Sequence, residues 1–424
     1  MKNSTLNSSN RTITKMLPHE IWPPDALDIE LQELSKQRNE DIGIKGKTGP
    51  IKEFEENFLA FLENQSKYSI SFNSGTSGLL AAYFAIGIKE GDVVLGPGLT
   101  YHAALSPVFS LQGSVRLIDI DINSRCIDFK EIEKNICEST KAITVVHQWG
   151  YPCNMDEIIK IAQKYNLKII EDCSHAHGSK YKGKLCGTFG NVAVFSLQTN
   201  KAIFAGEGGI LVTNDKDIYY RATLLGHYRD RCKSEILEKE LNDYWATGFG
   251  LKLRMSPFNA IVAKYSLQNF PKIKEGRHKC LNYFNERLKE VNYLQNIDIS
   301  NNVDMGAWYG FKPLYKEGIL QGISRDELVQ ILQKEGMEVS APSGKCLANQ
   351  PLYSEFPDRM FPLQKTKVVN NIESLPVCKY VEDNALSLPT FYDWENDKII
   401  IDQYIEVFKE IEYQHGKKQH TGTR

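Results

Sequence analysis

The chain lacks an excess of charge of either sign, and this absence already excludes some functions. Its 424 residues hold 51 Lys and Arg against 53 Asp and Glu, so the formal net charge is −2. Proteins that bind nucleic acid usually carry a basic excess or a basic stripe, and we therefore expect no nucleic-acid partner. With 42% hydrophobic and 25% charged residues, the chain has the composition of a folded globular protein and not of a disordered or collagen-like one.

Paired cysteines and long apolar runs are also missing. None of the nine cysteines belongs to a Cys-x-x-Cys pair, so zinc ribbons and thioredoxin-like motifs are not indicated, and we expect free thiols in a reducing cytosol. The longest apolar stretch, Leu79–Ile88, is far shorter than the ~20 residues that span a membrane. Met1–Met16 lacks the apolar core of a secretory signal. We expect a cytoplasmic protein without a membrane partner.

Alternating strand and helix patterns follow from Gly49 onward. Apolar residues recur at helical spacing over Ile51–Asn64 and Met155–Tyr165. Seven short apolar segments are typical of buried strands, and they are Tyr68–Phe72, Val93–Leu95, Val115–Ile118, Ala142–His147, Lys168–Glu171, Val192–Phe195 and Gly209–Thr213. Because nearly continuous apolar strands alternate with helices, we predict an α/β fold with a mixed, mostly parallel sheet covered on both faces.

The pattern changes after about Ile273, where helical segments begin to dominate. The expected helices are Gly276–Glu290, Ser324–Glu335 and Ile401–Glu412, with short strands at Phe311–Leu314 and Glu338–Ser340. This order is typical of a smaller α+β domain. We therefore divide the chain into an N-terminal tail and entry segment with a short helix at Asp25–Arg38 (1–48), a large domain (49–273), a small C-terminal domain (274–414) and a polar, disordered tail (415–424).

Polar motifs follow several of the expected strands, where ligands bind in open α/β sheets. After the first strand, Ser74-Gly75-Thr76-Ser77 opens a helix. Backbone N–H groups at a helix N-terminus, together with hydroxyl groups, can bind a phosphate. A capped helix with a tight turn explains the same residues equally well. The motif is neither a Walker loop nor a Gly-x-Gly-x-x-Gly fingerprint.

An acid and a lysine follow two other strands. Asp172 lies at the end of Lys168–Glu171, and His175 and His177 come shortly after it. Two histidines suggest a metal, but no paired cluster supplies further ligands, so we expect no metal site. Lys201 lies in a loop between two buried strands, where lysine is rarely found without a partner or a task, although a surface lysine is the simpler explanation.

The three features together point to a cofactor. A phosphate site, an acid and a lysine at one edge of a sheet are what pyridoxal phosphate (PLP) requires. The lysine would form a Schiff base with the aldehyde of the cofactor, and the acid would keep the pyridine nitrogen protonated. We therefore predict pyridoxal 5'-phosphate as the cofactor.

Six motifs in a fixed order also carry a family resemblance. They are Asn73-Ser74-Gly75-Thr76-Ser77, Pro97-Gly98-Leu99-Thr100-Tyr101, His147-Gln148-Trp149-Gly150-Tyr151-Pro152-Cys153-Asn154-Met155-Asp156, Glu171-Asp172-Cys173-Ser174-His175-Ala176-His177-Gly178, Phe195-Ser196 with Lys201, and Gly206-Glu207-Gly208-Gly209. The sequence closely resembles the DegT/DnrJ/EryC1/StrS family of PLP-dependent aminotransferases, which act mostly on keto-sugars. The resemblance runs from about Gly49 to Met255 and weakly beyond, and it implies a fold-type I PLP-dependent transferase.

The resemblance also implies roles for the matching residues. Lys201 would be the Schiff-base lysine and would move the proton during transfer. The family includes dehydratases in which a His replaces this Lys, so Lys201 argues for transamination. Asp172 would pair with the pyridine nitrogen, and Tyr101 would stack on the ring. The phosphate would be bound by Gly75, Thr76, Ser77 and Ser196.

Two positions depart from the family pattern. His175 stands where Gln is common, and it would make the same hydrogen bond to the ring hydroxyl of the cofactor, the alternative being a structural His. Lys252 stands where many relatives have an Asn that reaches the phosphate from the neighbouring subunit. As a cation it could bind phosphate in the same way, or it could be a rim lysine. Its reach across would place shared active sites at a homodimer interface. His102 and His227 are left unassigned.

The implied reaction moves an amino group from Glu or Gln to a small-molecule ketone by a ping-pong mechanism. A nucleotide-linked keto-sugar, in the biosynthesis of amino sugars, polysaccharides or secondary metabolites, is the expected acceptor. A cyclitol ketone of the inosose type is the main alternative. A PLP-dependent sugar dehydratase and a binding protein without turnover are two further alternatives, and the presence of both Lys201 and Asp172 argues against them.

Overall fold

The computed structural model describes residues 13, 28, 32, 49–227, 229–355 and 368–416. The entry segment 1–48, with the short helix expected at Asp25–Arg38, lies almost wholly outside the described residues, as do residues 417–424 of the expected tail. In the part of the chain that the structure describes, no helix is both long enough and apolar enough to cross a membrane.

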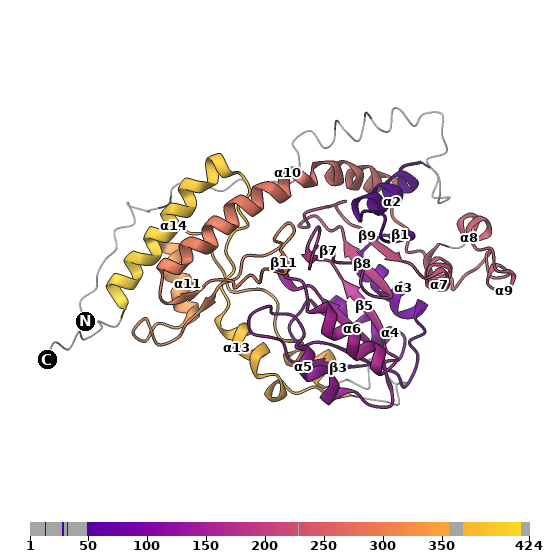
Figure 1. The fold of residues 1–424 in the computed structure, drawn as a ribbon, viewed down its shortest axis with the longest axis horizontal. Coiled ribbons are helices and arrows are strands. Elements are labelled where there is room, and N and C mark those ends of the chain that lie inside the picture. The colour runs from indigo at the N-terminus through magenta and orange to yellow at the C-terminus, as the bar shows by residue number, and fades with distance from the viewer. Residues whose placement is uncertain are drawn as a thin grey trace.

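A seven-stranded sheet lies at the centre of the first part of the chain, in the order β1-β9-β8-β5-β4-β2-β3 (Figure 1). Neighbouring strands pair in parallel except around β9, which is antiparallel to both β1 and β8. The strands are β1 (Tyr68–Phe72), β2 (Val93–Pro97), β3 (Ser114–Ile118), β4 (Thr140–Val146), β5 (Lys168–Asp172), β8 (Val192–Ser196) and β9 (Gly209–Thr213). The predicted α/β fold with a mixed, mostly parallel sheet is confirmed.

Both faces of the sheet are buried because successive residues of a strand point to opposite sides. In β4, Ala142 packs in the core that contains α3 (Gly75–Ala85), whereas Ile143 and Val145 belong to the core that contains α6 (Met155–Lys164). The other helices of this part are α2 (Gly49–Phe61), α4 (Pro107–Ser110), α5 (Phe129–Ile132), α7 (Lys216–Gly226), α8 (Asp230–Glu235) and α9 (Lys239–Asn242).

One long helix, α10 (Pro257–Arg287), joins the sheet region to the C-terminal part of the chain (Figure 1). It contacts α2 near one end and α14 (Trp394–His415) near the other. Its start is fixed by Ser256, whose side chain accepts a hydrogen bond from the Phe258 N–H at 3.3 Å, and by a proline at the first helical position.

The start expected for this helix at Gly276 is wrong, because the helix continues through Pro271. A proline inside a helix removes one hydrogen bond and usually predicts a break, which is why the expected helix began after it. The expected boundary between residues 273 and 274 falls inside α10. The division into a large part (49–273) and a small part (274–414) therefore remains a proposal, with one helix shared by both.

The C-terminal part is mainly helical, with α11 (Arg325–Lys334), α12 (Pro351–Ser354), α13 (Pro376–Asn384) and α14. The strand expected at Phe311–Leu314 is replaced by β12 (Leu314–Tyr315), which pairs with β10 (Leu294–Gln295). The strand expected at Glu338–Ser340 is wrong, since the segment forms only one bridge, between Ser340 and Ser387. A further small sheet contains β6 (Lys180–Tyr181), β7 (Lys184–Leu185) and β11 (Val303–Asp304).

A buried charge network fastens α8 to α2 and β1. Arg231 donates to both carboxylate oxygens of Glu55 at 2.9 Å and to Glu235 at 3.1 Å. Glu55 also accepts from the N–H and the hydroxyl of Ser71 at 2.8 Å. All three charged side chains are buried. The network therefore depends on the guanidinium, which is the only cation bonded to either carboxylate among the described residues.

Replacing Arg231 by Met should destabilise the protein strongly. The change leaves two carboxylates buried without their cation, which costs about 3–5 kcal/mol. We expect a lower midpoint of urea unfolding, followed by circular dichroism. Lys160→Met is the control, because it removes an exposed ion pair with Glu157 that is worth at most about 1 kcal/mol. Equal midpoints for the two variants would contradict this role of Arg231.

Candidate active site

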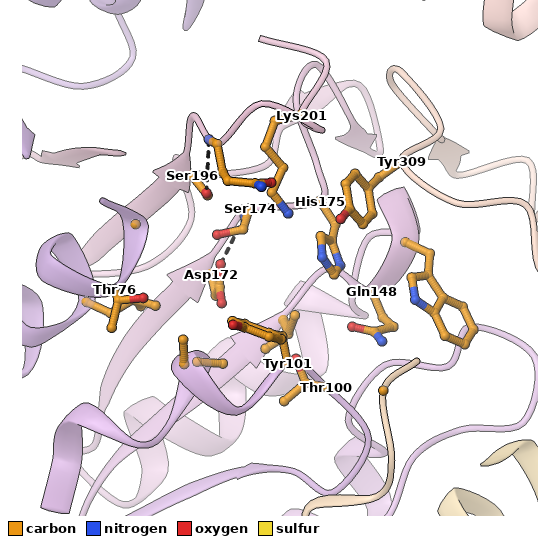
Figure 2. Close-up of a pocket in the computed structure, with 18 of the residues that line it drawn as sticks. Thr76, Thr100, Tyr101, Gln148, Asp172, Ser174, His175, Ser196, Lys201 and Tyr309 are labelled. Carbon is orange, nitrogen blue, oxygen red and sulfur yellow. Dashed lines mark hydrogen bonds between the residues drawn. The ribbon is translucent and has the colours of Figure 1, made fainter. Parts of the chain in front are cut away.

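A cavity of about 480 Å³ lies at the carboxyl edge of the sheet. Its walls come from the turns that follow β1, β2, β4, β5 and β8, and from two segments of the C-terminal part (Figure 2). Residues of both the N-terminal and C-terminal parts thus close the same space. The predicted site residues that line it are Gly75, Thr76, Tyr101, Asp172, His175, Ser196 and Lys201.

The N-terminus of α3 opens onto this cavity. The N-cap Ser74 accepts a hydrogen bond from the Ser77 N–H at 3.1 Å. A Cβ atom on Gly75 would lie 2.9 Å from the Cβ of Ser196, and one on Gly209 would lie 2.5 Å from the carbonyl oxygen of Ser74. Two glycines therefore let the end of α3 approach β8 and β9 closely. Gly75 and Thr76 at the start of α3 line the cavity, and the first N–H groups of a helix have no partner within the helix itself.

One predicted residue of this turn, Ser77, does not lie in the cavity wall. Its hydroxyl accepts a hydrogen bond from the Ser74 hydroxyl at 3.0 Å. Ser74, which the sequence analysis did not select, does line the cavity. Its place as the N-cap of α3 was the signal that could have identified it.

Lys201 and Asp172 lie at the centre of the site. Lys201 is only 7% exposed, and burial lowers the pKa of its amino group to about 8, although the charge of Asp172 opposes this change. Burial raises the pKa of the Asp172 carboxyl, which accepts a hydrogen bond from the Ser174 N–H at 3.0 Å. The pair combines an amine that can lose its proton near neutral pH with a buried carboxyl group.

Two stacked aromatic rings lie beside the amino group of Lys201. The rings of His175 and Tyr309 are parallel within 8°, with centroids 3.9 Å apart, and Lys201 Nζ lies 4.0 Å from the centroid of the Tyr309 ring. Figure 2 shows the three side chains next to one another. Burial, and then the charge of Lys201, keeps the pKa of His175 well below its usual value. His175 is therefore neutral, and its Nδ1 has no hydrogen-bond partner among the described residues.

The sequence analysis did not find Tyr309 or the neighbouring Lys312, although both line the cavity. They lie in the region where the family resemblance is weak, and no short motif marks them. Tyr101, which was predicted, lines the cavity with a side chain that is 63% exposed. A ligand could thus cover its ring.

Three other residues lie outside this cavity. Lys252 is exposed and is not part of the cavity wall of its own chain, so its reach into a neighbouring subunit remains a prediction. His227 is buried and packs edge-on against Phe72, with centroids 5.2 Å apart. His102 is exposed and lies near Ser106, at 3.3 Å. Neither histidine lines the cavity.

A buried group of His147, Glu171 and Cys173 has the spacing of a metal site. The His147 nitrogens and the Glu171 carboxylate, however, already have hydrogen bonds. Glu171 accepts from the backbone N–H groups of residues 187, 189 and 190, and it lies 3.0 Å from His147 Nε2. The other nitrogen of His147 accepts from the Cys153 N–H. The group therefore supports the turns after β4 and β5, and we assign no metal to it.

Comparison with known proteins places the chain in a family. The sequence profile of the DegT/DnrJ/EryC1/StrS aminotransferase family matches residues 27–399. The fold and the lysine-containing cavity are those of an α/β enzyme, and the chain belongs to this family. The predicted resemblance and the predicted class of enzyme, an aminotransferase, are thereby confirmed at the level of the family.

Two relatives and one solved structure illustrate the range of similar proteins. GDP-perosamine synthase of Escherichia coli O157:H7 is 30% identical over 364 residues, which are 84% of this chain and 89% of the relative. L-glutamine:scyllo-inosose aminotransferase of Streptomyces griseus is 35% identical over 231 residues, 53% of this chain and 54% of the relative. The structure of E. coli GDP-4-keto-6-deoxy-D-mannose-3-dehydratase with bound hydrated PLP has a TM-score of 0.74 at 23% identity, over 93% of this chain and 99% of that chain. At 23% identity, this last similarity shows the fold alone.

The low pKa of Lys201 can be measured in the cofactor-free chain. Only the neutral amine reacts with a small acylating reagent, so labelling of Lys201 should be half-maximal near pH 8. Asp172→Asn removes the charge that favours the protonated amine, and it should shift half-labelling to lower pH. Mass spectrometry reads each lysine separately. Exposed Lys160, whose pKa is raised by its hydrogen bond to Glu157, is the internal control. Half-labelling of Lys201 at the pH of Lys160 would contradict this account.

Proposed function

We propose that the chain binds PLP in this cavity and transfers an amino group from an amino acid to a keto-sugar. The observation that carries the proposal is Lys201, a buried lysine with a lowered pKa that shares a cavity with Asp172 and the N-terminus of α3. The family is an aminotransferase family, which supports the same chemistry. The large part of the chain (49–273) is the proposed PLP-binding domain, and the small part (274–414) closes the cavity.

The residues of the cavity fit this cofactor. The N–H groups at the start of α3, with Thr76 and Ser196, would hold the phosphate, since helix N-termini bind such anions. His175 Nδ1 is buried without a partner and would hydrogen-bond the ring hydroxyl. Asp172 would accept a hydrogen bond from the N–H of the pyridine ring, and Tyr101 would stack on one face of that ring. When bound, PLP would supply an electron sink for the carbon that loses its proton.

The proton itself would be moved by Lys201. An amine with a pKa of about 8 is partly neutral near pH 7, and its Nζ can accept a proton and return it at similar cost. The ring of Tyr309, 4.0 Å from Nζ, holds the amine over the cavity, a contact that favours its charged form. The charge of Asp172, which lines the same cavity, favours the protonated amine. In these roles, Lys201 as the base and Asp172 as the balancing charge would both be held at the carboxyl edge of the sheet.

For the acceptor, a nucleotide-linked keto-sugar is our first proposal. The relative whose match covers 84% of this chain is named GDP-perosamine synthase. A cyclitol ketone is the second candidate, because a relative with higher identity over a shorter matched stretch is named L-glutamine:scyllo-inosose aminotransferase. A dehydratase is less favoured, since Lys201 stands where the family's dehydratases have His. We propose Glu or Gln as the donor, and the cytoplasm as the location.

Replacing Lys201 by Ala should strongly reduce turnover while weak binding of PLP remains. The purified protein should be yellow with PLP, and borohydride should fix the cofactor to the tryptic peptide that contains Lys201. Lys201→Ala should bind PLP weakly and lose at least about 100-fold in turnover, because the proton transfer loses its base. The assay pairs Glu or Gln with nucleotide keto-sugars and inososes. Lys160→Ala is the control. A protein that stays colourless in excess PLP would sink the cofactor proposal.

We propose further that the enzyme is a homodimer in which Lys252 completes the partner's site. Mixed dimers test this directly. A Lys201→Ala subunit and a Lys252→Ala subunit should each be impaired alone. If Lys252 acts across the interface, a mixed dimer contains one intact site, and activity returns on mixing. If both residues act in the same subunit, mixing restores nothing, and the shared site is wrong.

A further inference from the structure

A second, small hollow adjoins the active-site cavity beside Gln148 and Trp149. Three residues, Gln148, Trp149 and Lys312, line both spaces. The hollow measures about 20 Å³, which is room for a group about the size of a water molecule. Its wall also contains Arg125. Two cationic side chains that are far apart in sequence therefore border the same small space.

Lys312 is a half-buried cation without a carboxylate partner in the described part of the chain. Its Nζ donates to the hydroxyl of Ser387 at 2.6 Å and lies 5.5 Å from the centroid of a Trp149 ring. Burial lowers its pKa to about 8, and no nearby charge opposes this change. An ammonium group has three N–H donors. The hydrogen bond to Ser387 uses one of them and leaves the others available beside the cavity.

Arg125 is the second cation, and part of its guanidinium has no hydrogen-bond partner among the described residues. It is 5% exposed, and its Nε and Nη1 have no partner among the described residues. Its backbone has a φ of 61°, in the region that few residues other than glycine adopt. The carboxylate of Asp121 is used instead by the backbone N–H groups of Asn123 and Ser124. The backbone at Arg125 thus holds a buried guanidinium whose Nε and Nη1 lack hydrogen bonds among the described residues, while the charge of Asp121 favours its protonated form.

Arg125 has buried N–H groups without a partner among the described residues, and Lys312 keeps N–H donors that Ser387 does not use, so an anion that joined the two cations would stabilise both. An oxyanion beside Lys312 would receive charge-assisted hydrogen bonds, which are among the strongest polar contacts in proteins. Both proposed substrates carry such a group, since the amino donor has a carboxylate and a nucleotide-linked acceptor has phosphates. Lys201 and His175 line the same cavity, so the anion would lie within one substrate length of the reacting atoms.

We propose that Lys312 and Arg125 bind an oxyanion of a substrate at this end of the active-site cavity. The inference rests on the proposed function, because it assigns the two cations to one of the substrates of that reaction. The hollow has room for one oxygen atom of an oxyanion, with the rest of the group in the adjoining cavity, and a carboxylate is smaller than a diphosphate, so the donor's carboxylate is the expected occupant. Lys312 belongs to the segment of the small part that closes the cavity, so binding there joins the two parts of the chain.

The test measures anion binding, not turnover. Protein saturated with PLP is titrated by calorimetry with glutarate, a dicarboxylate that lacks the donor's amino group, and separately with inorganic pyrophosphate. Lys312→Met should raise the dissociation constant of the bound anion at least about tenfold, since one charge-assisted hydrogen bond is lost. Arg125→Met should raise it in the same direction. Lys312→Arg, which keeps the charge, should remain within a few-fold of the unchanged protein.

Lys345→Met is the matched control, because Lys345 is exposed and follows Gly344 of the cavity wall. It removes the same charge and should leave both dissociation constants within about twofold, as expected for a screened surface charge. An effect on glutarate assigns the site to the donor carboxylate, and an effect on pyrophosphate assigns it to an acceptor phosphate. Undetectable binding of both anions, or equal effects of Lys312→Met and Lys345→Met, would overturn the proposal.

A failure of the proposed function would look different. If the chain does not take up PLP, the cofactor proposal fails, while the glutarate titrations of the unloaded variants still show whether Lys312 binds a carboxylate. Conversely, a yellow, active enzyme whose variants at Lys312 bind both anions normally keeps the proposed function and loses the anion site.

Discussion

The burial of Lys201 is the constraint on which the rest of the site depends. An amino group that is only 7% exposed loses most of its hydration, and its pKa falls to about 8. Asp172 opposes that fall. The balance between the two keeps the amine able to exchange a proton near neutral pH, and this property is the basis of the catalytic role that we propose for Lys201.

The surrounding fold can be understood as support for this pair. Parallel strands bring the turns after β1, β5 and β8 to one edge of the sheet. Buried hydrogen bonds from the N–H groups of Gly187 and Phe189 to Glu171 hold the end of β5, which carries Asp172. On the other side, the C-terminal part supplies Tyr309 and Lys312. The long helix α10 joins the two parts, so movement of one part relative to the other would open or close the same cavity.

The sheet could be predicted from the sequence, because each strand is a short apolar run between turn residues. β1 and β9 were placed at their observed bounds. The turns at the carboxyl edge followed from ordered motifs. The start of α10 could not be predicted, since Pro271 normally ends a helix. Tyr309 and Lys312 were missed because their importance comes from contacts with residues more than 100 positions earlier in the chain, such as the stack of Tyr309 on His175.

The central claim is that Lys201 moves the proton when an amino donor gives up its amino group in this cavity. A single-turnover measurement tests it without any knowledge of the acceptor. PLP-loaded protein is mixed with Glu or Gln, and the keto acid that is released is counted. We predict about one keto acid for each loaded cavity, and at least about 100-fold slower release from Lys201→Ala at equal loading. Release at an unchanged rate from that variant, or no release from the unchanged protein with either donor, would contradict the account.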